Sequence, residues 1–436
     1  MKSIWYENED SIPQFSSLKG ETKTDVLIIG GGMAGLLTAF FLHKAGVKYL
    51  LLEKDRIFRG ISGNTTAKIT FQHGLIYQKL LKDEGQEKTR LYLEANRSAA
   101  DTFADLCRKI DCDYKTADNL VYTTDDKGKL EREINALNKI GYKADLCENL
   151  PLPIKTAGAV RFKNQAEFNP IKFASAVAKG LNIRENTRVI AYEPNRVITE
   201  SGTITAERVI VTTHFPFINN HGAFFLKLYQ HRSYVLALKD AAEYEGMYVD
   251  EDKNGYSFRN YNGLLLLGGG GHKTGKRGGS YRELRDFAKK HYKSSHQIAA
   301  WAAQDCMSLD NMPYIGRYSK KTPELYTASG FNKWGMTSSM VAARILSDEM
   351  QGIRNEFSAV FSPDRSILKP QLFVNGVSSV EGMLSFSTKR CPHLGCALKW
   401  NKAEHSWDCP CHGSRFSKDG KLLDNPANCD IKNLDN

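Results

Sequence analysis

Two short stretches near the C-terminus constrain this chain more than any other feature of its sequence. They are Cys391-Pro392-His393-Leu394-Gly395-Cys396 and Cys409-Pro410-Cys411-His412-Gly413-Ser414. Each stretch offers one cysteine and one histidine at ligand spacing, Cys-x-His in the first and Cys-x-x-His in the second. Such a set suits a structural zinc ion. It also suits a [2Fe-2S] cluster that is held by two thiolates on one iron and two imidazoles on the other.

The spacing favours the cluster over zinc, because zinc motifs usually place their first two ligands two to four residues apart. A zinc site would also leave a second cysteine pair unused. Both stretches resemble the Rieske domains of the respiratory cytochrome bc type. This resemblance implies that the cluster ligands are Cys391, His393, Cys409 and His412. It further implies a disulfide between Cys396 and Cys411, which would link the two loops.

Two further positions follow from the same resemblance. Ser414 matches the serine whose hydroxyl hydrogen-bonds a cluster sulfide, and Phe416 stands where that family usually has a tyrosine. A missing hydroxyl stabilises negative charge on sulfur less well, so we expect a lower reduction potential than in the respiratory proteins.

A second motif lies near the N-terminus and predicts a dinucleotide-binding βαβ unit. The apolar strand Asp25–Ile29 leads into Gly30-Gly31-Gly32-Met33-Ala34-Gly35, a helix follows from Leu36 to Ala45, and the strand Tyr49–Leu52 ends in Glu53. In this fingerprint Gly30 makes the turn, Gly32 lets the backbone approach the pyrophosphate, and Gly35 lets the helix pack on the strand. Glu53 is placed to bind the ribose hydroxyls.

The segments that follow resemble the D-amino-acid oxidase superfamily and thereby favour FAD over NAD. The small-residue segment Gly60–Lys68 is similar to that family's flavin segment. Thr187-Arg188-Val189, Val209–Thr213, Asn311–Gly316 and Gly330–Met336 match later landmarks in family order. One departure is His214, which replaces a glycine of the family. The resemblance implies FAD contacts from these residues: Ser62, Val189, Gly330, Gly335 and Met336.

The substrate site is less distinct in the sequence. The resemblance places several polar side chains beside the active site: Lys68, Arg232, Tyr234, Tyr256, Arg259, His272 and Lys333. An arginine there would clamp a substrate carboxylate with two hydrogen bonds, and Lys68 would donate near the flavin N5. We take Lys68, Arg232, Arg259 and Lys333 as candidate catalytic residues. For each one alone, an ordinary surface or packing role is at least as common.

Composition limits the partners and the compartment. The chain has 436 residues and a net charge of +11. Its basic residues gather between His272 and Lys293 on a helical pattern, which fits either a solvated helix face or a docking surface for an acidic electron-transfer partner. No nucleic-acid motif, signal peptide or run of eighteen apolar residues is present, so we expect no nucleic-acid partner, no membrane span and a cytoplasmic location.

These patterns predict three parts. Residues 1–355 form an FAD-dependent oxidoreductase with a Rossmann-like, glutathione-reductase-type α/β domain (about 20–105, 155–225 and 305–355) and an antiparallel substrate sheet (about 106–154 and 226–304). Residues 356–369 form a linker, and residues 370–436 form a small all-β Rieske domain. Within the substrate sheet we expect strands at Phe224–Leu226, Tyr234–Leu238 and Leu264–Leu267, and a turn at Gly268–Gly271. A hairpin is expected from Leu372–Val374 and Met383–Phe386.

The predicted function combines both cofactors. FAD would oxidise a small substrate, an amine or an amino acid, and the cluster would carry the electrons singly to a protein acceptor. Two alternatives stay open at this point. Electrons could flow from a ferredoxin through the cluster to FAD, or the Rieske domain could serve as a docking or redox-sensing module.

Overall fold

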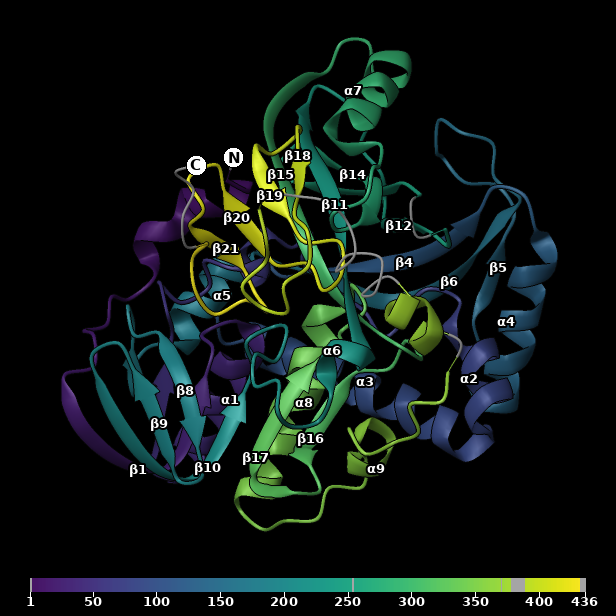
Figure 1. The fold of residues 1–436 in the computed structure, drawn as a ribbon. Helices are drawn as coiled ribbons and strands as arrows, with labels where there is room; N and C mark the ends of the chain where they lie inside the picture. Colours follow the sequence, from purple (N-terminus) through teal and green to yellow (C-terminus); the bar gives the residue numbers. More distant parts are fainter. Residues whose placement is uncertain (1, 253–254, 370, 378–388, 432–436) are drawn as a thin grey trace.

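The structure is a computed structural model that describes residues 2–252, 255–369, 371–377 and 389–431. It contains three sheets with helices packed around them (Figure 1). The first is an eight-stranded sheet in the order β16-β17-β10-β1-β2-β7, with β8 and β9 attached beside β10. Its strands are β1 (Gly20–Ile29), β2 (Tyr49–Leu52), β7 (Ile183–Arg184), β8 (Val189–Glu193), β9 (Arg196–Thr199), β10 (Gly202–Val211), β16 (Tyr314–Ser319) and β17 (Thr322–Ser329).

The first sheet carries the predicted dinucleotide fingerprint. β1 pairs in parallel with β2 and with β10, and its residues Val26–Ile29 are buried because helices or other strands cover both faces. α1 (Met33–Lys44) follows the glycine-rich turn and packs against α8 (Gly335–Met350). The α/β FAD-binding fold is therefore confirmed.

The second sheet has nine strands and forms the other half of the oxidoreductase. Its order is β15-β11-β14-β13-β12-β4-β6-β3, with β5 beside β6, and every pairing except β4–β12 is antiparallel. The strands are β3 (Lys68–Ile69), β4 (Lys115–Thr123), β5 (Asp145–Cys147), β6 (Gly158–Glu167), β11 (Leu228–Lys239), β12 (Met247–Asp250), β13 (Ser257–Tyr261), β14 (Leu264–Lys273) and β15 (His296–Ser308).

The remaining helices cover the edges of these sheets. α2, α3 and α4 gather on one side of the molecule, and α7 stands at the opposite end, near the Rieske strands (Figure 1). Their bounds are η1 (Ile4–Ser11), η2 (Ile61–Asn64), α2 (Ile76–Glu84), α3 (Gln86–Cys107), α4 (Lys127–Lys139), α5 (Pro170–Val177), α6 (Phe224–Lys227), α7 (Ser280–His291) and α9 (Ser358–Phe361).

The third sheet is small and antiparallel and lies in the C-terminal part of the chain. It consists of β18 (Lys399–Asn401), β19 (Ser406–Asp408), β20 (Arg415–Ser417) and β21 (Leu422–Asp424), drawn in yellow in Figure 1. The two cysteine- and histidine-containing loops precede β18 and β20. This arrangement confirms the small all-β C-terminal domain.

Three local predictions are wrong, two of them for a packing reason. Phe224–Leu226 belongs to the short helix α6, where Phe224 packs edge-on against Tyr318 at 4.6 Å between ring centroids. The glycine run Gly268–Gly271 continues strand β14 instead of turning. A Cβ atom on Gly270 would lie 2.5 Å from the Ser280 carbonyl oxygen, so the missing side chains let the start of α7 approach.

The third correction concerns the expected hairpin after the linker. Its first strand, Leu372–Val374, lies in a helix over residues 371–377, with Phe373 largely exposed. The second strand, Met383–Phe386, falls outside the described residues.

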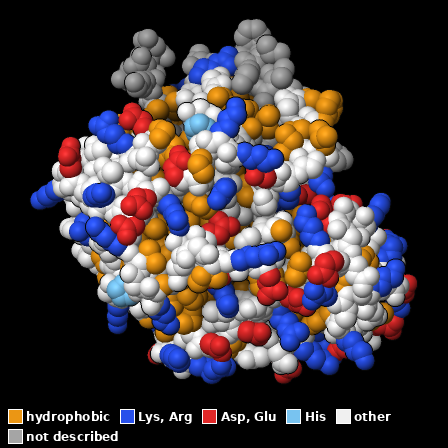
Figure 2. Space-filling model, turned by 90° about the horizontal axis from the view of Figure 1, so that it is seen from below, with side chains coloured by type: hydrophobic (Ala, Val, Ile, Leu, Met, Phe, Trp, Pro, Cys, Tyr) orange, Lys and Arg blue, Asp and Glu red, His pale blue; other side chains and the backbone are white. Residues whose placement is uncertain are grey.

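The positive net charge is not concentrated on the face shown in Figure 2, where lysine and arginine side chains alternate with acidic ones. On α7, the apolar residues Tyr281, Leu284 and Phe287 are buried, and Arg282 is exposed and 3.8 Å from Asp286. The basic residues of α7 thus occupy its outer face. Among the described residues, no helix combines the length and the apolar composition that crossing a bilayer requires.

Candidate functional site

A cavity of about 1040 Å³ lies between the two large sheets and reaches the Rieske domain. The predicted cofactor and substrate residues that line it are Gly30, Gly32, Glu53, Ser62, Lys68, Val189, Arg232, Tyr234, Lys333, Gly335 and Met336, while Tyr256 and His272 do not line it. Gly35, Gly330 and Arg259 do not line it. The cavity therefore unites the dinucleotide fingerprint with most of the candidate residues from distant parts of the chain.

The glycine-rich turn fits a dinucleotide because side chains are excluded from it. A Cβ atom on Gly35 would lie 1.9 Å from the carbonyl oxygen of Gly30, and Gly30 itself has φ +113°. A Cβ atom on Gly32 would lie 3.1 Å from the Ser62 hydroxyl oxygen. The turn thus brings α1 close to β1 and leaves the start of the helix open to the cavity, which is how such turns bind a pyrophosphate.

Glu53 and Ser62 complete this cradle. The Gly31 backbone N–H donates to Glu53 Oε2 at 2.7 Å, and burial raises the pKa of the Glu53 carboxyl. The Met33 N–H, in the first turn of α1, donates to Ser62 Oγ at 2.9 Å. These residues fit the predicted FAD: an acid stands at the ribose position, and a hydroxyl stands beside the helix N-terminus.

Gly330 shapes the approach to α8 from outside the cavity. It has φ +72°, and a Cβ atom there would lie 3.1 Å from the Leu228 side chain. Its role is therefore to permit the turn, while Gly335 and Met336 at the start of α8 face the cavity.

Lys68 lies in β3 and lines the cavity, and its Nζ donates to Thr66 Oγ1 at 3.0 Å. Burial and, secondarily, the nearby Arg259 lower the pKa of Lys68 to about 7, although Glu167 opposes the shift. A lysine with this pKa can hold or release a proton near neutral pH.

Replacing Lys68 with methionine is expected to stabilise the protein at low and neutral pH. The folded pKa of about 7 lies below the ordinary lysine value of 10.5, so keeping this lysine protonated in the folded state costs free energy. That cost is fully present below pH 7 and fades as the pH rises toward 10.5. The free energy of unfolding should rise by about 2 kcal/mol at pH 6.5. This value is smaller than the full pKa shift implies, because water can enter the cavity and stabilise the charged lysine. Denaturant unfolding at pH 6.5 and 9.5 measures it, with the exposed Lys48→Met as the matched control. A gain that does not shrink with rising pH would contradict the lowered pKa.

Arg259 is fully buried and acts on the loop before Lys68 rather than on the cavity. Its guanidinium donates to the carbonyl oxygens of Thr66 and Ala67, the latter at 2.7 Å, and lies 3.1 Å from the Glu167 carboxylate. Arg259 therefore fixes the backbone that leads to Lys68, and its contacts are those of a positioning residue.

Arg232, the other predicted carboxylate clamp, has its carboxylate partner inside the protein. Its guanidinium grips Glu404 of the C-terminal domain with two hydrogen bonds, one of them 2.7 Å from Nε to Oε2, and lies 3.8 Å from Asp424. Arg415 shares the same acids, at 3.1 Å from Glu404 and 2.9 Å from Asp424. Together these four residues, all largely buried, tie the Rieske domain to β11.

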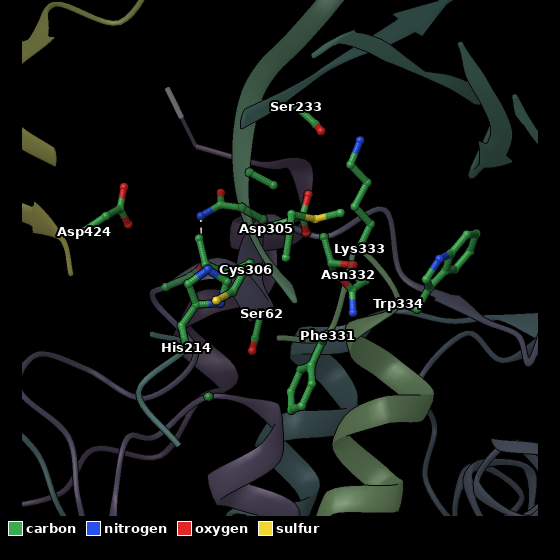
Figure 3. A pocket seen from close by; sticks show the side chains of 18 of the residues that line it. Ser62, His214, Ser233, Asp305, Cys306, Phe331, Asn332, Lys333, Trp334 and Asp424 are labelled. Atoms are coloured by element: carbon green, nitrogen blue, oxygen red, sulfur yellow. Dashed lines mark hydrogen bonds between the residues drawn. The ribbon is translucent and has the colours of Figure 1, made fainter. Parts of the chain in front are cut away.

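The region around the start of α8 contains the groups most available to a substrate. Figure 3 shows Asp305 in the cavity, with Lys333 and Ser233 on one side and Asp424 of β21 on the other. Burial raises the pKa of Asp305 to about 6, although Lys333 and Arg232 oppose the shift. Nearby, the His73 ring stacks on Trp334 with centroids 5.2 Å apart, and burial lowers the pKa of His73 to about 3.

The two C-terminal loops have matching backbone geometry. Gly395 N–H donates to the Cys391 oxygen at 2.9 Å, and Gly413 N–H donates to the Cys409 oxygen at 3.0 Å. Both glycines have positive φ, +74° and +85°. The loops bring the His393 and His412 rings to 4.9 Å between centroids. The two loops therefore have the same backbone turn and place their histidine rings next to each other.

The donor atoms fit a cluster with mixed ligands. His393 Nδ1 is buried and has no hydrogen-bond partner among the described residues, while Nε2 of the same ring bonds Asn219 Oδ1 at 2.8 Å. Ser414 Oγ accepts the Ala427 N–H at 2.9 Å, and the Ser414 hydroxyl hydrogen-bonds the Cys391 sulfur, so it lies at the predicted ligands. The Cys391 and Cys409 thiols hydrogen-bond each other, which lowers the pKa of Cys409 and raises the pKa of Cys391. The two predicted thiolate ligands therefore lie side by side.

The predicted disulfide between Cys396 and Cys411 is not borne out. Both are free thiols, and their sulfur atoms and that of Cys409 all lie within 4.8 Å of one another. Cys409 therefore stands beside both, so neither is paired exclusively with the other. Of these three cysteines, only Cys409 is a predicted cluster ligand. The ligand set Cys391, His393, Cys409 and His412 therefore stays a prediction.

His214, which the sequence showed only as a departure from the family pattern, and Phe215, which it did not single out, connect the cavity to the cluster loops. His214 lines the cavity, and the ring of the next residue, Phe215, lies 6.4 Å from those of both His393 and His412. Burial lowers the pKa of His214 to about 4, so its imidazole is neutral at pH 7. His214 has φ +68°, a left-handed backbone conformation that glycine adopts most readily.

Hydrogen bonds from the second large sheet hold the cluster loops. Gln230 Nε2 donates to the carbonyl oxygens of His412 and Asn425, at 3.1 and 2.7 Å. Gln304 Nε2 donates to the Gly413 oxygen at 2.9 Å. Glutamines in strands β11 and β15 carry no motif, so only the fold could reveal their position.

Comparison with known proteins agrees with this geometry. Residues 25–349 match the model of the family described as FAD dependent oxidoreductase, and residues 358–435 match that of the Rieske [2Fe-2S] domain. The chain is 34% identical to the putative Rieske 2Fe-2S iron-sulfur protein YhfW of Bacillus subtilis, over 100% of this chain and 97% of that protein.

Solved structures show the same fold for the larger part. Glycine oxidase from Geobacillus kaustophilus superposes with a TM-score of 0.67 at 19% identity, over 79% of this chain and 100% of its own. L-Proline dehydrogenase from P. horikoshii gives a TM-score of 0.66 at 16% identity, over 80% and 98%. The chain therefore belongs to the FAD-dependent oxidoreductases of the D-amino-acid oxidase type, and it carries FAD and, in a C-terminal Rieske domain, a [2Fe-2S] cluster.

Proposed function

We propose that this oxidoreductase is a dehydrogenase that oxidises an amine or amino acid at its CH–NH group and delivers the electrons singly to a protein acceptor. The observation that carries the proposal is the short link between the two cofactor sites. His214 lines the FAD cavity, and the adjacent Phe215 contacts both cluster histidines. A flavin supplies two-electron chemistry and a Rieske cluster supplies one-electron transfer, so their proximity suits a relay.

The reaction balances with two molecules of acceptor. The C–H bond next to nitrogen breaks and a C=N bond forms, which releases two electrons with the hydride. The electrons leave one at a time, so each substrate reduces two molecules of an oxidised one-electron carrier protein. Two protons also form, one from the broken C–H bond and one from the nitrogen, and both pass to solvent. Lys68, with a pKa of about 7, is placed in the cavity to accept such a proton.

The charges in the cavity favour a cationic amine over a carboxylate substrate. The four arginines that line the cavity all have carboxylate partners in the protein: Arg59 with Glu9 at 3.0 Å, Arg188 with Glu200 at 3.8 Å, Arg232 with Glu404, and Arg415 with Asp408 at 3.0 Å. Asp305 also lines the cavity, beside Lys333 and Arg232. Its carboxylate can pair with the ammonium group of a substrate.

An anaerobic panel of amines and amino acids tests this proposal through bleaching of the flavin absorbance. We expect amines without a neighbouring carboxylate to bleach the flavin fastest. With oxygen admitted, peroxide should form slowly compared with reduction of a one-electron acceptor. Fast peroxide formation with a cluster that stays oxidised would contradict the relay. Exclusive bleaching by α-amino acids would contradict the preference for a cationic amine.

A further inference from the structure

The C-terminal segment 422–428 faces the FAD cavity although it belongs to the Rieske domain. Six of its seven residues line the same cavity as Gly30, Glu53 and Val189 (Leu422, Leu423, Asp424, Asn425, Ala427 and Asn428). The segment follows β20 and includes strand β21, and the Ala427 N–H bonds Ser414 of the second cluster loop. One short piece of chain thus touches the cluster loop on one side and the FAD cavity on the other.

Two asparagines hold this segment against the FAD-binding sheet. Asn428 Nδ2 donates to the Val189 carbonyl oxygen at 2.9 Å, at the start of β8. Asn425 Nδ2 donates to the carbonyl oxygens of Thr213 and Phe215, the latter at 2.6 Å, just after β10. Both asparagines therefore bond the backbone of the dinucleotide-binding domain at positions that border the cavity.

The segment stands at the adenosine half of the cavity. Asn428 bonds Val189, and Lys54 acts on the Asp424 carboxylate. Both partners line the cavity together with Glu53, the acid at the ribose position. Burial would raise the pKa of Asp424, but Arg415 and Arg232, helped by Lys54, hold it below its usual value. These cations balance the charge of the Asp424 carboxylate. Residues 422–428 therefore do not repel a ligand that carries phosphate groups.

Leu423 gives residues 422–428 an apolar surface that faces the cavity. Its side chain is 45% exposed although it lines the cavity. A half-exposed leucine inside a cavity gains free energy when a flat apolar ligand covers it.

We propose that residues 422–428 of the Rieske domain form the outer wall of the adenosine half of the FAD site, so that FAD bridges the two domains. The coupling is reciprocal by linkage: docking of the Rieske domain strengthens FAD binding, and FAD holds the Rieske domain in place. This inference rests on the FAD site alone and does not depend on the substrate or on the direction of electron flow.

Titration of the FAD-free full-length protein tests the wall without any substrate. Leu423→Ala and Asn428→Ala should each weaken FAD about tenfold, the effect of a lost apolar contact or hydrogen bond. Lys421→Ala is the matched control. Lys421 directly precedes residues 422–428, is exposed and does not line the cavity. We expect the control to stay within twofold. Iron content equal to that of the parent protein verifies that each variant is folded.

Two probes localise the effect within FAD. ADP contains the adenosine half of FAD, so its affinity should fall by the same factor in Leu423→Ala and Asn428→Ala. Lumiflavin contains only the isoalloxazine ring, and its affinity should not change. Equal weakening of lumiflavin would overturn the assignment to the adenosine half.

Hydrogen exchange of the unmutated protein provides a second, independent test. Addition of FAD to the FAD-free chain should slow amide exchange in residues 422–428 at least tenfold, as it should in the glycine-rich turn. FAD affinities within twofold of the parent in both variants, or exchange in residues 422–428 that FAD does not slow, would overturn the proposal.

Discussion

Replacing Cys409 with serine is expected to remove the cluster and to abolish electron delivery while leaving the flavin reaction intact. Cys409 is buried, its pKa is lowered by the neighbouring thiols, and the serine hydroxyl cannot supply a thiolate. Iron and labile sulfide should fall to near zero. Turnover with a one-electron acceptor should fall at least a hundredfold, because the relay has no other route. Substrate should still bleach the flavin under anaerobic conditions.

The matched control is Cys429→Ser, since Cys429 is an exposed free thiol in the same domain. This variant should retain iron, sulfide and turnover. Turnover that is unchanged in an iron-free Cys409→Ser protein would favour the alternative in which the Rieske domain only docks or senses. Metal analysis and steady-state assays on the same preparations decide between the two.

Replacing Gly35 with alanine is expected to yield protein that lacks FAD. The added Cβ would lie 1.9 Å from the Gly30 oxygen and 2.8 Å from Thr212 Oγ1. Backbone and a buried side chain must therefore move apart, which separates α1 from β1 at the point where the pyrophosphate binds. We expect FAD occupancy below a tenth of the parent value and a lower thermal midpoint, with the iron content retained.

Gly376→Ala serves as the control, because a Cβ atom at Gly376 would meet nothing within 4 Å. Flavin absorbance per chain and iron per chain report the two cofactors separately. A Gly35→Ala protein with full FAD would show that the helix can shift without loss of the cofactor, and it would contradict the role assigned to this close approach.

Features that depend on residues near one another in the chain could be predicted from the sequence. The fingerprint Gly30–Gly35 lies between a strand and a helix that each have their own pattern, and the structure places them as predicted. In the two cluster loops, the structure brings the His393 and His412 rings to 4.9 Å between centroids, while the ligand set read from their spacing stays a prediction. In both cases short-range geometry decides the outcome.

Features that depend on distant partners could not be predicted. Arg232 has the position of a substrate clamp in the sequence, yet its partner Glu404 lies 172 residues away. Likewise Gly268–Gly271 has the composition of a turn. The close approach of α7 requires glycine at Gly270, and the side chains of Ser257 and His231 leave no room for a Cβ atom at Gly268 and Gly271.

The contact between the domains gave no sequence signal at all. Asn425 and Asn428 follow the last cluster ligand in a polar segment that resembles an ordinary loop, and Gln230 and Gln304 lie within strands. Their hydrogen bonds to backbone carbonyl oxygens require no partner side chain, so no motif marks them. These contacts bring the cluster loops to the FAD cavity, on which the relay depends.

The central claim is that electrons from the substrate pass through FAD to the Rieske cluster of the same chain. The most direct test is freeze-quench electron paramagnetic resonance after anaerobic mixing with an amine that bleaches the flavin. The account predicts that the signal of the reduced cluster appears as the flavin absorbance recovers, at a rate independent of protein concentration. A bleached flavin beside a cluster that stays oxidised would contradict it.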